Sequence, residues 1–202
     1  MQVRLLIFCV GLATVLGLGL IGLPVHFDEA QYATWQAYPD LSYQTKGPFV
    51  TFVQSLTHHE YLPHLVQVRL SAWFAWAGSG FLFLWLAHLA GFDRIQLERL
   101  LILYVASPMI LVIGSIHTTD VWLLFFLLLS LCAFASILHC RVNQHTELWW
   151  MLMGGALGLG ALAKLSIALI PIVLVLWIVV RAPRLVLSPG PYLGLLFCTF
   201  CM

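Results

Sequence analysis

Long apolar runs with few charged residues between them dominate this sequence. Hydrophobic residues make up 62% of its 202 residues and charged residues only 8%, and the mean hydropathy is +0.99. Soluble domains carry about 25% charged residues, because a folded globule needs a polar shell. The composition therefore excludes a soluble enzyme, a disordered chain and a disulfide-stapled secreted module. It indicates an all-α polytopic membrane protein, and the net charge of +1 argues against a nucleic-acid partner.

Segments of roughly 20 apolar residues can cross a bilayer core as helices. We predict six full spans, at residues 5–23, 66–90, 97–113, 120–138, 148–163 and 165–180. The first is interpreted as a retained span, because its apolar run is longer than that of a signal peptide and no small-residue cleavage site follows. A truncated seventh run begins near Tyr192 and reaches Met202. Either the chain is the N-terminal part of a larger protein, or this last piece lies along the membrane interface.

The positive charges between the spans indicate an orientation, since cytoplasmic loops carry an excess of Lys and Arg. A cytoplasmic N-terminus places three cations outside, Lys46, Arg69 and Lys164. It places the larger set inside: Arg4, Arg94, Arg99, Arg141, Arg181 and Arg184. The first loop, about residues 24–65, is therefore predicted to face the periplasm or lumen.

Polar chemistry is concentrated in this first loop. It contains half of the acidic residues of the chain and four of its eight histidines: Asp28, Glu29, Asp40, Glu60, His26, His58, His59 and His64. It is also rich in Tyr and Trp, which favour the boundary between membrane and water. Residues 30–38 are predicted to form a short helix lying on that boundary.

Three carboxylates stand out beside the predicted spans. Asp28 and Glu29 follow the first span, where they could cap a helix, act as a general base or hold a metal ion. Asp120 begins the fourth span, and an acid at the edge of the hydrocarbon usually has a partner. His117 lies three residues earlier and could share a helical face with Asp120, either as a metal ligand or as a structural hydrogen-bonding group.

Three cations could likewise serve either ligand binding or a structural role. Lys46 precedes a Gly-Pro turn and could bind a phosphate or simply extend its ammonium group toward water. Arg69, at the entrance to the second span, could hold phosphate oxygens or anchor the helix at the interface. Lys164 interrupts a long apolar stretch and predicts a hairpin there. Its ammonium group needs an anion, either a substrate phosphate or a nearby acid such as Asp120.

Together, four segments resemble the GT-C membrane glycosyltransferases, and more narrowly the group of protein mannosyltransferases and aminoarabinose transferases. In chain order they are Asp28-Glu29-Ala30-Gln31-Tyr32, Lys46-Gly47-Pro48-Phe49, Thr118-Thr119-Asp120 and Gly158-Leu159-Gly160-Ala161-Leu162-Ala163-Lys164. Many relatives have Lys-Pro-Pro where this chain has Lys46-Gly47-Pro48. The resemblance covers the N-terminal part of the family's transmembrane domain, residues 1–202, without its soluble C-terminal region.

The resemblance implies an inverting transferase that moves a sugar from a polyprenyl phosphate to a lipid, glycan or protein acceptor on the periplasmic side of a bacterial inner membrane. Asp28 would be the general base or orient the acceptor, supported by Glu29 and Asp120. Lys46, with Arg69 and Lys164, would bind the lipid phosphate. A divalent metal ion held by Glu29, Asp120 and His117 is a further option that the resemblance leaves open.

Two other functions remain open from the sequence. A transporter could use Asp120 and Lys164 as an intramembrane charge pair, but it should show paired repeats with interrupted helices, and the chain has no convincing repeat. A truncated chain without activity is the other alternative. The clustering of acids at one face favours chemistry at the membrane surface.

Overall fold

In the computed structural model, every residue is described except 1, 37, 39, 44–45, 60 and 140–145. The described residues form helices, turns and one isolated β-bridge, with no strand. The helices are α1 (Gln2–Gly17), α2 (Phe27–Gln36), α3 (Phe49–Leu56), α4 (His64–Leu89), α5 (Arg94–Ala106), α6 (Pro108–Ser115), α7 (Thr119–His139), α8 (Thr146–Ala163), α9 (Leu169–Arg181) and α10 (Gly190–Cys201). A π-helical turn, Leu18–Gly22, extends α1, and 3₁₀ turns at Leu165–Ala168 and Pro183–Leu187 flank α9. The predicted all-α class is confirmed.

Within the described part of the chain, three helices are long and apolar enough to cross a membrane. They are Val3–Gly22, His64–Leu89 and Thr119–His139, and α5 with α6 adds a fourth if this bent pair is one span. Two further apolar helices, Leu165–Arg181 and Gly190–Cys201, are shorter. The chain is thus a multi-pass helical membrane protein, while the count of six full spans and a partial seventh stays a prediction.

The span expected as one continuous helix over 97–113 is broken. Its two halves, α5 and α6, meet at an angle of 60°. Pro108 has no backbone N–H and disfavours a helical conformation in the residue before it. Ser107 accordingly adopts an extended conformation, with φ −72° and ψ 115°, and α6 begins at Pro108.

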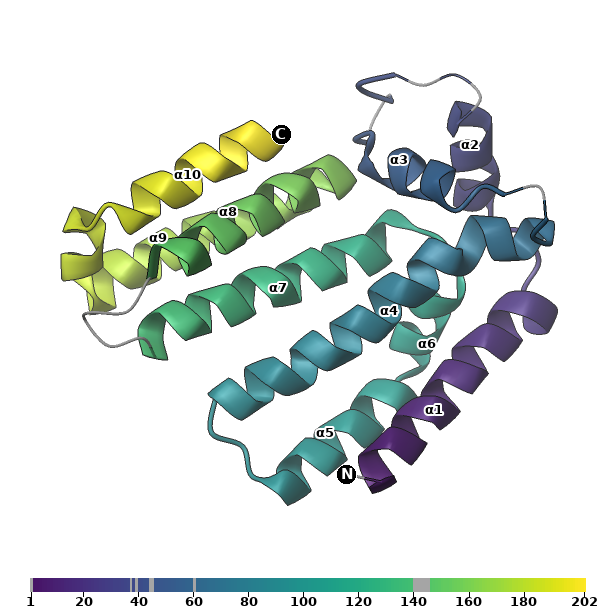
Figure 1. Cartoon of the computed structure of the whole chain (residues 1–202), viewed down its shortest axis with the longest axis horizontal. Helices are drawn as coiled ribbons and strands as arrows, with labels where there is room; N and C mark the ends of the chain where they lie inside the picture. The colour runs from purple at the N-terminus through teal and green to yellow at the C-terminus, as the bar shows by residue number, and fades with distance from the viewer. Residues whose placement is uncertain (1, 37, 39, 44–45, 60, 140–145) are drawn as a thin grey trace.

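Helices α4 and α7 lie side by side in the middle of the bundle, with α1, α5 and α6 on one side and α8, α9 and α10 on the other (Figure 1). Small residues let α8 and α10 approach closely. A Cβ atom added at Gly154 would collide with the carbonyl group of Gly194, and one at Gly158 with that of Cys198. Close contact between glycine-bearing helices is typical of packing in membranes, where dispersion rather than water exclusion holds helices together.

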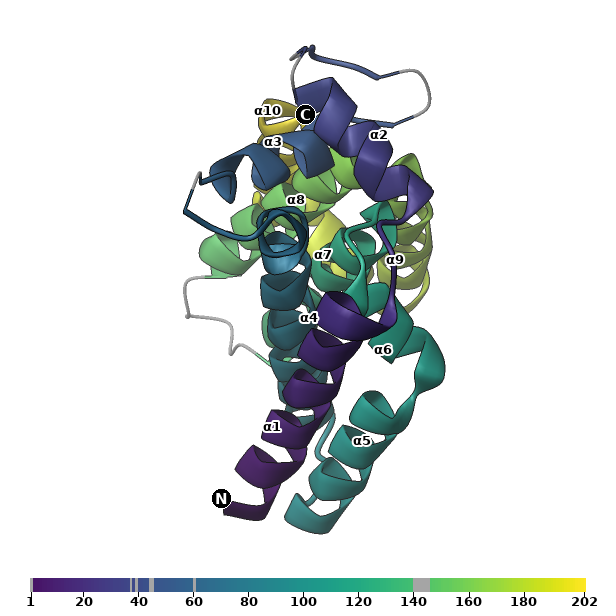
Figure 2. The ribbon, with the colours of Figure 1, turned by 90° about the vertical axis from the view of Figure 1, so that its right-hand side faces the viewer.

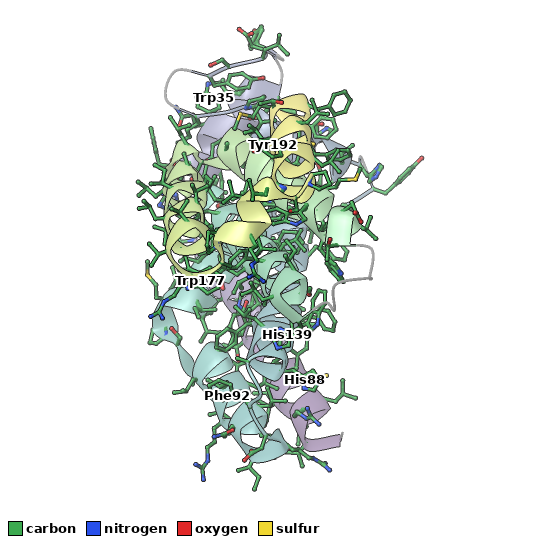
Figure 3. All side chains as sticks on the ribbon, turned by 90° about the vertical axis from the view of Figure 1, so that its left-hand side faces the viewer. Trp35, His88, Phe92, His139, Trp177 and Tyr192 are labelled. Atoms are coloured by element: carbon green, nitrogen blue, oxygen red, sulfur yellow. The ribbon has the colours of Figure 1, made fainter. Side chains whose placement is uncertain are left out.

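The first loop covers one end of the bundle. Helices α2 and α3 lie there, and the N-terminus lies at the opposite end (Figures 1 and 2). Trp35 of α2 marks the covered end, while His88 and Phe92 lie toward the other (Figure 3). A helix was expected at 30–38, and α2 occupies this region but begins three residues earlier.

The end of the bundle opposite α2 carries paired charges. Arg4 and Arg94 both approach Glu98, at 3.9 and 3.5 Å. Two charged residues counted in the sequence lie outside the described residues. They are Arg141, one of the cations predicted to lie inside, and Glu60, one of the acids of the first loop.

Candidate active site

The start of α2 brings Glu29 back toward the residue before the helix. The backbone N–H of His26 donates to Glu29 Oε2 at 2.8 Å, and the backbone N–H of Asp28 donates to His26 Nδ1 at 3.2 Å. This reciprocal arrangement resembles a capping box, with an imidazole in place of the usual hydroxyl. The capping role considered for the acidic pair is therefore present at Glu29.

Glu29 and Arg69 form a fully buried ion pair. Arg69 donates from Nε to Glu29 Oε1 and from Nη2 to Oε2, both at 2.7 Å, and neither side chain has exposed surface. Burial alone would raise the pKa of Glu29. Hydrogen bonds from Arg69 and from the backbone N–H groups of His26 and His117 outweigh burial and lower this pKa below its usual value.

The Glu29–Arg69 pair ties four segments together. Arg69 also donates to the backbone carbonyl groups of Gly19, Leu23 and Pro24, at 3.1 Å for Leu23 and 2.7 Å for Pro24. The backbone N–H of His117 donates to Glu29 Oε1 at 2.8 Å. The end of the first helix, α2, α4 and the connection between α6 and α7 therefore meet at one buried charge pair, and every guanidinium nitrogen of Arg69 is engaged.

Asp28, the neighbour of Glu29, reaches a different partner. Lys46 Nζ donates to Asp28 Oδ1 at 2.6 Å and to the hydroxyl group of Tyr32 at 3.1 Å. The same ammonium group lies 4.8 Å from the centre of the Tyr32 ring. The side chains of Asp28 and Lys46 keep 27% and 22% of their surface exposed, so a ligand can reach this pair.

Lys46 is held in place through Tyr43, which packs on an aromatic residue of α2. Tyr43 and Lys46 exchange two backbone hydrogen bonds, at 3.1 and 2.7 Å. The Tyr43 ring stacks on Trp35 at 4.7 Å. A Cβ atom at Gly47 would collide with the backbone carbonyl of Leu162, so the Lys-Gly-Pro turn rests directly on the end of α8.

Burial and hydrogen bonds oppose each other in this cluster. Burial would lower the pKa of Lys46, but its hydrogen bonds to Asp28 and Tyr32 raise that pKa above its usual value. Burial also raises the pKa of Tyr32, and the hydrogen bond from Lys46 only partly offsets this effect. The raised pKa keeps Lys46 protonated at neutral pH, with its ammonium group against Asp28 Oδ1.

A second ion pair joins Asp120 and Lys164. Lys164 Nζ donates to Asp120 Oδ1 at 2.5 Å, and the Lys164 and Asp120 side chains are 41% and 45% exposed. The hairpin predicted at Lys164 is present, because α8 ends at Ala163 and Lys164 is extended with φ −156° and ψ 119°. The nearby acid, one of the two partners considered for Lys164, is thus its partner in this structure.

Tyr32 connects the two ion pairs. It is fully buried, its hydroxyl group contacts Lys46, and it approaches the backbone N–H of Thr119, the residue before Asp120. It also packs against Ala163, the residue before Lys164. The sequence reasoning did not assign Tyr32 a role. Four residues separate it from Asp28, the spacing of neighbours on one helical face, but the helix predicted at 30–38 did not reach Asp28.

His117 is buried away from both lysines. It lies before α7 rather than within it, so it does not share a helical face with Asp120 as expected. Trp122 donates to His117 Nε2 at 3.4 Å, and Ser71 Oγ lies 3.2 Å from the same nitrogen. An indole N–H can only donate, so Nε2 accepts from Trp122, and His117 Nδ1 has no partner among the described residues. Burial lowers the pKa of His117 to about 4, although the charge of Glu29 opposes the shift.

The structure does not bring Glu29, Asp120 and His117 together as a metal-ligand set. Both Glu29 oxygens accept hydrogen bonds, and Asp120 faces Lys164. Among the residues that the structure describes, no three His, Cys, Asp or Glu side chains gather closely enough to hold an ion. These residues as arranged do not fit a divalent metal ion.

An apolar groove begins beside the Lys46 turn. Its volume is about 440 Å³, and it runs between the first loop and α8. Pro48, Phe49 and Phe52 form one wall, and Leu159 and Leu162 form the other. The two lysines therefore lie near a surface suited to a hydrocarbon chain.

A family model described as dolichyl-phosphate-mannose-protein mannosyltransferase matches residues 46–202. The chain belongs to this family. Membership confirms the resemblance to GT-C glycosyltransferases and makes the chain a membrane glycosyltransferase of that type. No curated protein and no solved structure matches it.

The matched range of this glycosyltransferase begins at Lys46 and includes Arg69, Asp120 and Lys164. Asp28 and Glu29 precede that range. The structure nevertheless links both of them to it, Asp28 through Lys46 and Glu29 through Arg69.

Proposed function

We propose that this protein transfers a sugar from a polyprenyl phosphate to a lipid, glycan or protein acceptor, at the periplasmic face of a bacterial inner membrane. The observation that carries the proposal is the accessible Asp28–Lys46 ion pair at one end of an apolar bundle. It combines a carboxylate able to take a proton with an ammonium group able to hold a phosphate.

Donor binding would activate the carboxylate by exchanging ion-pair partners. Without donor, the Lys46 ammonium group occupies Asp28 Oδ1. A lipid phosphate competes for the ammonium group and releases Asp28, so the base becomes available only when the donor is in place. The apolar groove beside Pro48 and Phe49 would receive the first part of the prenyl chain.

The reaction is an inverting displacement at the anomeric carbon. The acceptor oxygen or nitrogen forms a bond to that carbon as the bond to the phosphate oxygen breaks. The phosphate leaves with the electron pair, and the acceptor proton passes to Asp28. Lys46 and Lys164 would stabilise the negative charge that develops on the leaving phosphate.

The remaining charged residues would organise the site. Asp120 orients Lys164, with which it pairs at 2.5 Å. We assign Glu29 and Arg69 a positioning role, because each is fully buried and bound by the other.

Substitution of Asp28 tests the proposal. Membranes containing Asp28→Asn should release at least about 100-fold less polyprenyl phosphate from a radiolabelled polyprenyl-phosphate hexose than membranes containing the wild-type chain. Asp93→Asn is the matched control, since Asp93 caps α5 at the other end of the bundle and asparagine caps a helix as well. Unchanged release by Asp28→Asn, at equal protein level, would remove Asp28 from the mechanism.

A further inference from the structure

A second cavity lies between α2, α3 and the start of α4. These helices meet at the end of the bundle that the first loop covers (Figure 2). Its volume is about 360 Å³, at the low end of the roughly 300–1,000 Å³ that small-molecule sites occupy. The size suits one small group rather than a long chain.

The polar groups of this cavity are side-chain amides and imidazoles. Three glutamines and two histidines contribute, Gln36, Gln54, Gln67, His58 and His64. None of the described residues that line it carries a carboxylate, ammonium or guanidinium group. A phosphate would need a cation and an amine would need an acid, so the lining favours an uncharged ligand that both donates and accepts hydrogen bonds.

Gln54 gives independent support for a ligand. Its side chain is 2% exposed and lines the cavity, and its Oε1 atom has no hydrogen-bond partner among the described residues. A buried acceptor without a partner costs free energy, and rotation of the Gln54 amide toward the cavity would let a hydroxyl group there satisfy it. Ala33 and Val68 supply an apolar wall beside it.

We infer that this cavity binds one uncharged sugar ring, as the acceptor subsite of the transferase. A ring presents several hydroxyl groups, each able to donate and to accept, and so matches the amide lining. The donor sugar is attached to a phosphate and must stay beside the lysines, neither of which lines the cavity. Gln36 lines both this cavity and the apolar groove, so the two lie next to each other. The acceptor role rests on the function proposed above, whereas binding of a sugar ring does not.

Saturation-transfer NMR on the purified full chain in detergent tests the inference, with methyl α-mannopyranoside and methyl α-galactopyranoside as probes. At least one glycoside should bind to the wild-type chain. Gln54→Leu should weaken that binding at least about 5-fold, because a buried hydrogen bond is lost. Gln31→Leu makes the same change on α2 at a position that does not line the cavity, and should leave binding unchanged.

A stability measurement separates binding from folding. Gln54→Leu removes an unpartnered buried acceptor, so the ligand-free variant should melt no lower than the wild type. Ala33→Leu fills the cavity without changing Gln54, and it should abolish glycoside binding. It also provides a second test if Gln54→Leu fails to fold. Absence of glycoside binding, binding only of an uncharged serine peptide, or unchanged glycoside binding in both variants would overturn the inference.

The two proposals fail in different ways. Loss of glycoside binding in Gln54→Leu, together with normal donor turnover by Asp28→Asn, would leave the sugar site and reject the transfer mechanism. Loss of turnover in Asp28→Asn, together with unchanged glycoside binding in Gln54→Leu and Ala33→Leu, would leave the mechanism and reject the sugar site.

Discussion

Lys46 and Asp28 are 18 residues apart in the sequence, yet their charged groups meet at 2.6 Å. The contact closes the first loop over the end of the bundle and leaves both side chains partly exposed. The Glu29–Arg69 pair in the same structure is, by contrast, completely buried. Partial exposure instead leaves each partner open to exchange with a ligand.

If a phosphate displaces Asp28 from Lys46, substitutions of these two residues should change phosphate binding in opposite directions. Lys46→Ala should weaken binding of farnesyl phosphate about 10-fold or more, because a charge-assisted hydrogen bond is lost. Asp28→Asn should tighten it, because a competing anion is removed. Thermophoresis of the detergent-purified chain measures both, with Arg94→Ala at the opposite end as the control. Equal weakening by the two substitutions would contradict the exchange.

The buried Glu29–Arg69 pair should matter mainly for folding. Glu29→Gln leaves a guanidinium group buried without its counter-ion, and we expect it to lower the free energy of unfolding by about 3–5 kcal/mol. Arg4→Ala, at the partly exposed 3.9 Å pair with Glu98, should cost less than about 1 kcal/mol. Denaturant unfolding in detergent measures both. The double change Glu29→Leu with Arg69→Met should cost less than the sum of the single changes, and strict additivity would argue against direct coupling.

His117 predicts a loss of stability in mild acid. Its pKa is about 4 in the folded chain, against 6.5 for an ordinary histidine. Between these values the unfolded chain binds a proton that the folded chain does not. The contribution of His117 to the free energy of unfolding is therefore fully present above pH 6.5. It falls by roughly 3 kcal/mol as the pH drops to 4. Melting temperatures of the wild type and His117→Gln, measured from pH 7 to pH 4, should converge toward the acid end. If the two melting temperatures stay equally far apart at every pH, His117 is not the group responsible for the loss of stability.

Glu29 adds a second loss of stability in acid, which begins as the pH falls below about 4.5. Its folded pKa lies below the usual 4.5, so its contribution is present above pH 4.5 and is lost as the pH falls through the folded value. This loss should persist in His117→Gln, which separates the two groups.

Lys164 should affect transfer far more than stability. Its pair with Asp120 is nearly half exposed, and such pairs contribute about 0–1 kcal/mol. Lys164→Ala should reduce release of polyprenyl phosphate at least about 10-fold while the melting temperature stays nearly constant. Lys164→Arg, which keeps the charge, should restore part of the release. A variant that retains full turnover would limit Lys164 to pairing with Asp120.

Local features of the sequence were sufficient to predict much of the architecture. The apolar runs predicted the all-helical membrane class, since hydrocarbon requires each segment to satisfy its own backbone hydrogen bonds. Lys164 predicted the turn after α8, because an ammonium group inside an apolar stretch interrupts a span. The bend at Pro108 was missed, although the residue that causes it was visible, because the apolar run continues through it.

The partners of the charged residues could not be predicted in the same way. Asp28 and Glu29 are adjacent in the sequence and chemically alike, and either could have been assigned the base. Consecutive residues on a helix point about 100° apart, so the orientation of α2 on the bundle turns Glu29 inward to Arg69 and Asp28 toward Lys46. The sequence by itself determined which charges flank the apolar helices, because local hydropathy governs that. Only the tertiary structure decided which of them are buried and which stay accessible, because that depends on how helices distant in the sequence pack together.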